Sequence, residues 1–192
     1  MQKKIFAILI FTSIVLVSIL VVIAPSFSGV SSLARKSLQK KLDLDLILND
    51  NKDVKLVFFG YSSCPDICSP RLSSLNHYYN SIDEINRKRI GVEFLDISTP
   101  VDKTLPQRYA EFFNPEFKGI YLNTDILRVY TKAFNVFFSK SFIDKTEYDH
   151  TAHLYIIQKV NKTKYLRYIY NTYPYDFKQI NKDIKGLLNE PY

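Results

Sequence analysis

The sequence predicts an α/β domain of three layers with a mixed central sheet, preceded by one N-terminal transmembrane helix. Three observations support this fold class. The chain begins with a long uncharged segment over residues 5–24, short apolar runs then alternate with amphipathic segments up to residue 134, and a hairpin and a final helix close it. Strands that alternate with helices form parallel pairs, whereas a hairpin adds antiparallel strands, so the sheet should be mixed.

The N-terminal segment predicts a membrane anchor. Residues 5–24 carry no charge, and their polar members are Thr12, Ser13 and Ser18. A helix of this length spans about 30 Å, the thickness of a bilayer hydrocarbon core. A cleaved signal peptide is the alternative, but the apolar run exceeds the usual length and residues 22–25 offer no Ala-x-Ala site. We therefore expect an uncleaved helix in contact with membrane lipid.

The same segment bears on which membrane holds the chain and on which side of it the soluble part lies. Basic residues stand on both sides of the span, Lys3 and Lys4 before it and the cluster 35–41 after it, so their count does not settle the orientation. A leader of four residues is most simply placed in the cytoplasm. Since no Arg-rich and Ser-rich presequence is present, we expect a bacterial inner membrane, with the soluble domain on the periplasmic side.

Composition limits the classes of partner. The 192 residues are 46% hydrophobic, enough for one globular domain, which we place at 51–192 after the anchor (1–24) and a linker (25–50). The net charge of +7 is scattered among acidic residues, and its densest cluster, 35–41, would contact lipid headgroups or solvent. No basic and aromatic motif accompanies it, so we expect no nucleic-acid partner.

The soluble part divides into four predicted strands and four predicted helices. Residues 54–59 are an apolar run ended by Gly60, which is typical of a buried central strand. Ser69 as N-cap and Pro70 at the first helical position predict a helix that starts near Ser69 and places Cys68 at its N-terminal end. The remaining elements are a strand at 91–97, helices at 105–113 and 126–134, a hairpin of 153–160 with 164–170, and a helix at 179–188.

Cys64 and Cys68 are the two cysteines, and three residues separate them. A disulfide across so short a loop would remove little entropy from the unfolded chain, so an inert staple is the weaker interpretation. At the N-terminus of a helix, unsatisfied N–H groups and the helix dipole lower the pKa of a thiol. Thiolates are both nucleophiles and soft metal ligands, so the pair alone does not separate redox chemistry from metal binding.

The three histidines decide whether a metal has a further ligand. His77 lies in the middle of the predicted first helix, where a solvated side chain is expected. His150 and His153 lie in the loop that enters a late strand, which in a thioredoxin-type arrangement can lie beside the cysteine loop. Two thiolates and one imidazole suit Cu(I) and can hold Cu(II), whereas a closed zinc site requires four protein ligands.

These motifs resemble the SCO/SenC family of membrane-anchored copper chaperones for cytochrome c oxidase. The Phe-Gly-Tyr that ends a strand is matched at 59–61, Cys-Pro-Asp-x-Cys at 64–68, and Asp-His-Ser/Thr ahead of a strand at 149–151. The resemblance implies a thioredoxin-like fold and a copper site formed by Cys64, Cys68 and His150, with His153 outside the motif.

The chain departs from the family pattern in three places. The family's proline directly after the second cysteine is displaced by one position here, to Pro70, which still starts a helix. A family-specific hairpin ahead of the central strand corresponds here to residues 31–53, a short and partly basic stretch without glycine, so 25–50 would hold a truncated extension. The family's acidic Arg-Asp-Thr-Pro-like segment is reduced to residues that begin at Asp96, and a role for Asp96 beside the site stays open.

Two functional hypotheses result. The first is a membrane-anchored metallochaperone that passes copper by ligand exchange to an apo copper-site protein such as an oxidase subunit, with no small-molecule substrate. The second is a thiol-disulfide oxidoreductase in which Cys64 is the more exposed nucleophile and Cys68 the resolving thiol. His150 separates the two, because a dithiol reductase would tolerate its loss. A peroxidase would need one isolated activated cysteine, and the pair disfavours it.

Overall fold

The computed structural model describes residues 12–13, 34–44, 51–64 and 66–190. The chain forms two compact units, Met1–Lys36 and Ser37–Tyr192, and the second contains the α/β domain. Of the membrane helix predicted over 5–24, the structure describes Thr12 and Ser13, which are helical; the rest lies outside the described residues. Within the described part of the chain, no helix has both the length and the apolar character needed to cross a membrane.

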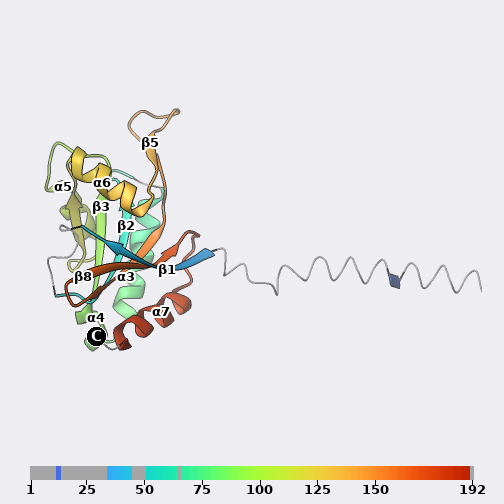
Figure 1. Cartoon of the computed structure of the whole chain (residues 1–192). Helices are drawn as coiled ribbons and strands as arrows, with labels where there is room; N and C mark the ends of the chain where they lie inside the picture. The colour runs from blue at the N-terminus through green and yellow to red at the C-terminus, as the bar shows by residue number, and fades with distance from the viewer. Residues whose placement is uncertain (1–11, 14–33, 45–50, 65, 191–192) are drawn as a thin grey trace, which may run out of the picture. The chain divides into compact units, whose positions relative to one another are not determined.

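A six-stranded mixed sheet forms the centre of the domain (Figure 1). Its strands are β1 (Arg35–Leu42), β2 (Val54–Gly60), β3 (Ile90–Asp96), β4 (Lys118–Tyr121), β7 (Leu154–Val160) and β8 (Thr163–Tyr170), in the order β1-β8-β7-β2-β3-β4. Strands β2, β3 and β4 run parallel to one another, whereas β2 with β7 and β7 with β8 are antiparallel. The mixed α/β fold that the sequence predicts is therefore confirmed.

Five helices and a small hairpin complete the described part of the domain. The helices are α3 (Cys68–Ser81), α4 (Glu84–Arg89), α5 (Leu105–Phe113), α6 (Thr124–Phe134) and α7 (Phe177–Asn189). Strands β5 (Phe138–Lys140) and β6 (Tyr148–His150) pair antiparallel in a separate two-stranded sheet. This β5–β6 hairpin, orange in Figure 1, extends away from the main sheet.

The core lies on both faces of β2 and β3, where every residue is buried. Successive side chains of a strand point to opposite faces, so Phe58 and Phe59 serve different layers. Phe58 lies on the face covered by α3 and α5, where its neighbour Phe94 contacts Tyr109. Phe59 packs against Phe134 of α6 on the other face, with ring centroids 5.2 Å apart. The three layers thus place the C-terminal end of β2 against the start of α3.

The structure corrects two sequence-based predictions. Residues 35–42 were expected within a linker but form β1, an edge strand whose Lys40 donates to the carbonyl of Ala133. An edge strand tolerates charged side chains, so it lacks the apolar alternation that identifies a strand in a sequence. Helix α3 begins at Cys68, which the sequence placed at its N-terminal end, but its N-cap is Ile67 rather than Ser69, and the Ile67 side chain makes no capping bond.

Candidate metal centre

The two cysteines lie in the loop that joins β2 to α3, residues 61–68, which we call the cysteine loop. A tight turn brings the chain back, with the backbone N–H of Cys64 bonded to the carbonyl of Tyr61 at 3.0 Å. Cys68 is the first residue of α3, and its N–H donates to the sulfur of Cys64 at 3.3 Å. The Cys64 sulfur therefore lies at a helix N-terminus, where negative charge is stabilised. Both cysteines are free and buried.

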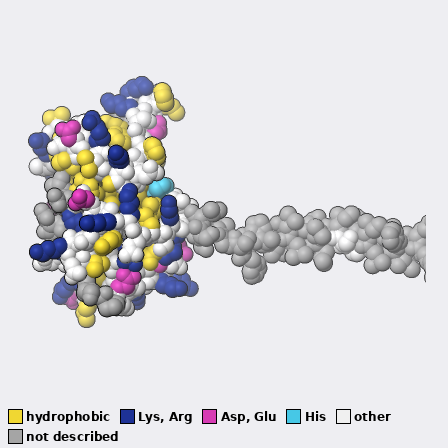
Figure 2. Space-filling model, in the orientation of Figure 1, with side chains coloured by type: hydrophobic (Ala, Val, Ile, Leu, Met, Phe, Trp, Pro, Cys, Tyr) yellow, Lys and Arg dark blue, Asp and Glu magenta, His cyan; other side chains and the backbone are white. Residues whose placement is uncertain are grey.

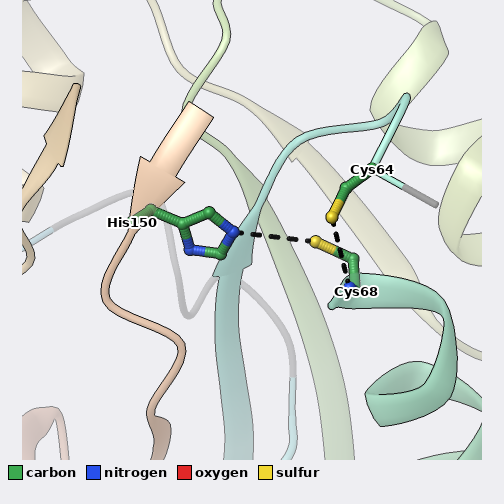
Figure 3. Close-up of side chains that lie close together, drawn as sticks. All are labelled: Cys64, Cys68 and His150. Atoms are coloured by element: carbon green, nitrogen blue, oxygen red, sulfur yellow. Dashed lines mark hydrogen bonds between the residues drawn. The ribbon is translucent and has the colours of Figure 1, made fainter. Parts of the chain in front are cut away.

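His150 reaches the cysteines from the end of β6 (Figure 3). Its Nε2 lies 3.9 Å from the Cys68 sulfur, and its Nδ1 lies 3.1 Å from the carbonyl oxygen of Thr151. Because a carbonyl oxygen can only accept, Nδ1 carries the proton and the lone pair of a neutral ring is on Nε2, facing the sulfurs. The two sulfurs and a ring nitrogen of His150 all lie within 4.8 Å of one another. One metal ion could contact all three.

The cysteine pair holds one proton. The hydrogen bond from the Cys68 side chain, helped by the backbone N–H of Cys68, lowers the pKa of Cys64 to about 3, although burial opposes this shift. The same hydrogen bond, together with burial and the nearby Cys64 charge, raises the pKa of Cys68. Near neutral pH, Cys64 is thus a thiolate and Cys68 a thiol that donates to it.

Asp96 fixes the beginning of the cysteine loop. It ends β3, is fully buried, and accepts hydrogen bonds from both the backbone N–H and the hydroxyl of Ser62. Its other oxygen accepts from the N–H and hydroxyl of Ser98, at 2.7 and 2.5 Å. This carboxylate contacts neither sulfur. The role beside the site that the sequence left open is to hold two loops together.

A second set of contacts holds Cys64 itself. The hydroxyls of Tyr109 and Ser69 donate to the Cys64 carbonyl oxygen, at 3.1 and 3.3 Å. Tyr109 belongs to α5 and Ser69 to α3, so two helices fix the backbone of one ligand candidate. Sequence reasoning did not assign these residues, because their roles depend on contacts across the fold.

Gly60 makes room for the Cys68 sulfur. A Cβ atom at position 60 would lie 2.6 Å from that sulfur and 2.9 Å from the ring of Phe94, both closer than side chains normally approach. The absence of a side chain at the end of β2 is therefore part of the site. The sequence signal was the glycine that separates the apolar strand from the cysteines.

We expect Gly60→Ala to lower the free energy of unfolding by about 1–3 kcal/mol, because the new methyl group overpacks a filled core. Gly186→Ala is the matched control: a Cβ there meets nothing within 4 Å, and alanine in a helix is favoured over glycine by about 1 kcal/mol. Urea unfolding of both variants measures the difference. Equal stability of Gly60→Ala and the wild type would contradict the close approach.

The other two histidines lie outside the site. His77 is exposed on α3, as the sequence predicts. His153 is half-buried, contacts the ring of Tyr155, and has a pKa lowered by burial and by the charge of Arg71. It is not part of the Cys64, Cys68 and His150 group. The structure thus brings together the three residues that the family resemblance indicates.

The site is open on the side of the histidine. Cys64 is 3% exposed and Cys68 is fully buried, whereas His150 lines a cavity of about 550 Å³ together with Phe137, Phe138, Ser139, Asp149 and Thr151. Beyond it, Phe142 and Ile143 are almost fully exposed in the turn that joins β5 and β6. Figure 2 shows hydrophobic and basic side chains gathered at this outer end of the hairpin.

A family model, a curated protein and two solved structures that resemble this chain agree with one another. The family model described as SCO1/SenC matches residues 51–189. A SCO2-like protein of Rickettsia conorii is 29% identical over 65% of this chain and 63% of its own length. The solution structure of apo Sco1 from Thermus thermophilus is 25% identical, with a TM-score of 0.61 over 81% of this chain and 93% of that one. An Arabidopsis thaliana ScoI structure, described as having copper bound, is 18% identical, with a TM-score of 0.61 over 72% of this chain and 84% of that one.

These comparisons agree with the fold and with the motifs that the sequence carries. The chain spans somewhat less than two thirds of the length of the curated Rickettsia relative. The family model, by contrast, covers the greater part of this chain, from just before β2 to the end of α7. The chain belongs to the SCO1/SenC family.

Proposed function

We propose that this protein binds one copper ion through Cys64, Cys68 and His150. The observation that carries the proposal is the meeting of two sulfurs and an imidazole nitrogen within 4.8 Å. Two thiolates with one imidazole form a soft set of low coordination number that suits Cu(I) and can also hold Cu(II). A closed structural zinc site would require a fourth protein ligand. The copper-bound Arabidopsis relative supports the same choice of metal.

We further propose that the protein is a metallochaperone that delivers this copper to an apo copper site, such as that of a cytochrome c oxidase subunit. Delivery by ligand exchange requires that a partner's donors reach the metal one at a time. The buried sulfurs and the cavity beside His150 favour an approach from the histidine side. His150 would then be released first, and the two sulfurs afterwards.

The proposal includes the place where delivery happens. We propose that residues 5–24 anchor the chain in a bacterial inner membrane, with residues 51–192 on the periplasmic side. The uncharged length of 5–24 supports an anchor, since about 20 apolar residues span a bilayer. Protease added to spheroplasts should then digest the domain; protection until the membrane is dissolved would contradict this orientation.

A thiol-disulfide oxidoreductase is the alternative, and one observation favours it. The lowered pKa of Cys64 makes it a thiolate near neutral pH, the form that attacks disulfides. Cys64 is the more exposed of the two cysteines, as predicted, but only slightly so, which hinders attack on a folded partner. Metal binding accounts for His150 as well as the pair, so it is the preferred function.

The test is a transfer experiment with the full-length, reduced protein in detergent. We expect one Cu(I) per chain, retained on gel filtration, and its transfer to an apo protein domain that has a dithiol copper site. An alkylated sample of the same protein is the control, since its sulfurs cannot bind. Absence of Cu(I) binding by the reduced protein would refute the proposed function.

The state of the cysteine pair predicts how many protons copper displaces. Because Cys64 is already a thiolate and only Cys68 keeps its proton, Cu(I) binding near pH 7.5 should displace about one proton from the pair, whereas ordinary thiols would release about two. Affinity should accordingly rise about tenfold per pH unit in this range. Calorimetry in buffers of different ionisation enthalpy measures the number, and a value near two would contradict the assignment.

A further inference from the structure

Basic side chains gather at the end of the domain opposite the metal site. The cysteine loop follows the last residue of β2, and the seven residues of that strand span about 20 Å. The first residues of β2 pair with the start of β3 and the end of β7, so α4 and the β7–β8 turn lie at the other end (Figure 1). We call it the basic end, and its partly or fully exposed basic residues are Lys41, Lys52, Arg87, Lys88, Arg89, Lys159, Lys162 and Lys164.

Hydrogen bonds join the segments of the basic end. The N–H of Asp53 donates to the carbonyl of Arg89, and its carbonyl accepts from the N–H of Lys159, both at 2.8 Å. Two of the basic residues are in ion pairs, Arg89 with Asp53 and Lys88 with Glu84, each at 2.6 Å. The other basic residues listed above outnumber the remaining acidic residue of this surface, Asp43. The basic end therefore carries a net positive charge.

A small cavity within the basic end is lined mostly by lysines. It has a volume of about 180 Å³, and its lining residues are Lys41, Leu42, Asp43, Leu44, Lys162, Thr163 and Lys164. Lys41 and Lys162 are exposed, whereas Lys164 is half-buried and donates to the carbonyl of Leu44. Lysine binds phosphate as a point charge, so a cavity of this size and charge can admit a phosphate group.

An apolar side chain protrudes among these charges. Ile85 lies in α4 and is 79% exposed, and none of the residues of α4 is buried. Apolar and basic side chains on one surface are the combination that binds the interface of an anionic bilayer. In the β5–β6 hairpin, at the metal-site end, acidic residues outnumber Lys140 and Lys145. Anionic headgroups therefore favour the basic end over the hairpin.

The proposed anchor brings a bilayer within reach of the domain. Residues 25–34, ten in all, separate the proposed anchor from β1. Ten residues reach at most about 35 Å, whereas the eight residues of β1 span about 26 Å. The linker is thus long enough for either end of the domain to meet the bilayer, and the charges select the end.

We propose that the basic end binds the phosphate headgroups of anionic lipids, which turns Cys64, Cys68 and His150 away from the bilayer. This inference rests on the proposed membrane anchor and deepens the proposed function, because it presents the metal site to a partner outside the membrane. Each lysine near an anionic surface strengthens the association about fivefold. Salt weakens such attraction, since it screens exposed charges.

The test uses the full-length protein in nanodiscs of phosphatidylcholine, with or without phosphatidylglycerol. Lysines are acylated briefly and their labelling rates are measured by mass spectrometry. With phosphatidylglycerol, we expect Lys41 and Lys162 to react at least about fivefold more slowly, and high salt should remove the difference. Lys140 and Lys145 of the hairpin are the internal controls and should react equally in both kinds of disc.

Two double variants sharpen the test. Lys41→Gln, Lys162→Gln should lose the protection of Lys159, because each removed lysine weakens the association about fivefold. The matched control Lys140→Gln, Lys145→Gln should keep it. Both pairs are exposed, so neither substitution disturbs the core.

The outcomes separate this inference from the proposed function. Protection of Lys140 and Lys145 in place of Lys41 and Lys162 would overturn the inference, because the hairpin would then face the bilayer. Equal labelling in both discs, or the same protection from inorganic phosphate without phosphatidylglycerol, would also overturn it. If the protein does not co-elute with the discs, the proposed anchor fails. Binding to phosphatidylglycerol vesicles, tested with the same variants, then decides the inference, and none of these readouts depends on copper.

Discussion

The double variant Cys64→Ala, Cys68→Ala is expected to lose Cu(I) affinity by at least about four orders of magnitude, because a single imidazole remains of a three-donor set. Both sulfurs lie within 4.8 Å of the other donor atoms, so no ligand is spare. Competition with a coloured Cu(I) chelator, in the absence of oxygen, measures the affinity. A double variant that keeps Cu(I) binding would show that the metal is held elsewhere.

Folding must be measured alongside, because both cysteines are buried. Replacing a buried cysteine with alanine removes one sulfur atom and leaves a small cavity, at a cost of about 1 kcal/mol for each site. We therefore expect circular dichroism close to that of the wild type and a modestly lower melting temperature. Cys64→Ser and Cys68→Ser keep the volume more closely and separate the two sulfurs. Loss of binding in a folded variant identifies the sulfurs as ligands.

Sequence reasoning works best for elements whose burial is complete. Apart from Lys55, Glu93 and Asp96, the residues of β2 and β3 are apolar or glycine, and both strands are fully buried, so a short window of sequence identifies them. The same reasoning does not identify β1, because its residues are mostly exposed and charged and do not alternate between apolar and polar. Strands β5 and β6 have three residues each, too few for a period to be visible.

The site shows the same division between local and long-range information. The cysteine spacing and the following helix are local, so the sequence identifies both sulfurs and their position at a helix N-terminus. The choice between His150 and His153 is not local: the residues alone left it open, and the family resemblance indicated His150. The supports from Asp96 and Tyr109 depend on a strand end and a helix that meet the cysteine loop only in the fold.

His150→Ala is expected to weaken Cu(I) binding by about 100-fold or more while leaving two sulfur donors in place. The reason is that Nε2 faces the sulfurs, with the ring oriented by its bond to Thr151. With Cu(II), the spectrum should change in kind, because the metal loses its nitrogen donor. Chelator competition and absorption spectroscopy of the full-length protein measure both effects. Retained affinity and spectrum would favour the oxidoreductase.

His153→Ala is the matched control for that experiment, since it removes an imidazole three positions away that is also half-buried. His153 contacts Tyr155 and lies outside the donor group, so its loss should leave Cu(I) affinity within about twofold of the wild type. A dithiol-disulfide reductase activity, if the protein has one, should survive in both histidine variants, because disulfide exchange uses only the sulfurs. Copper binding that depends on His150 and not on His153, with thiol exchange unchanged in both, is the pattern that a copper carrier requires.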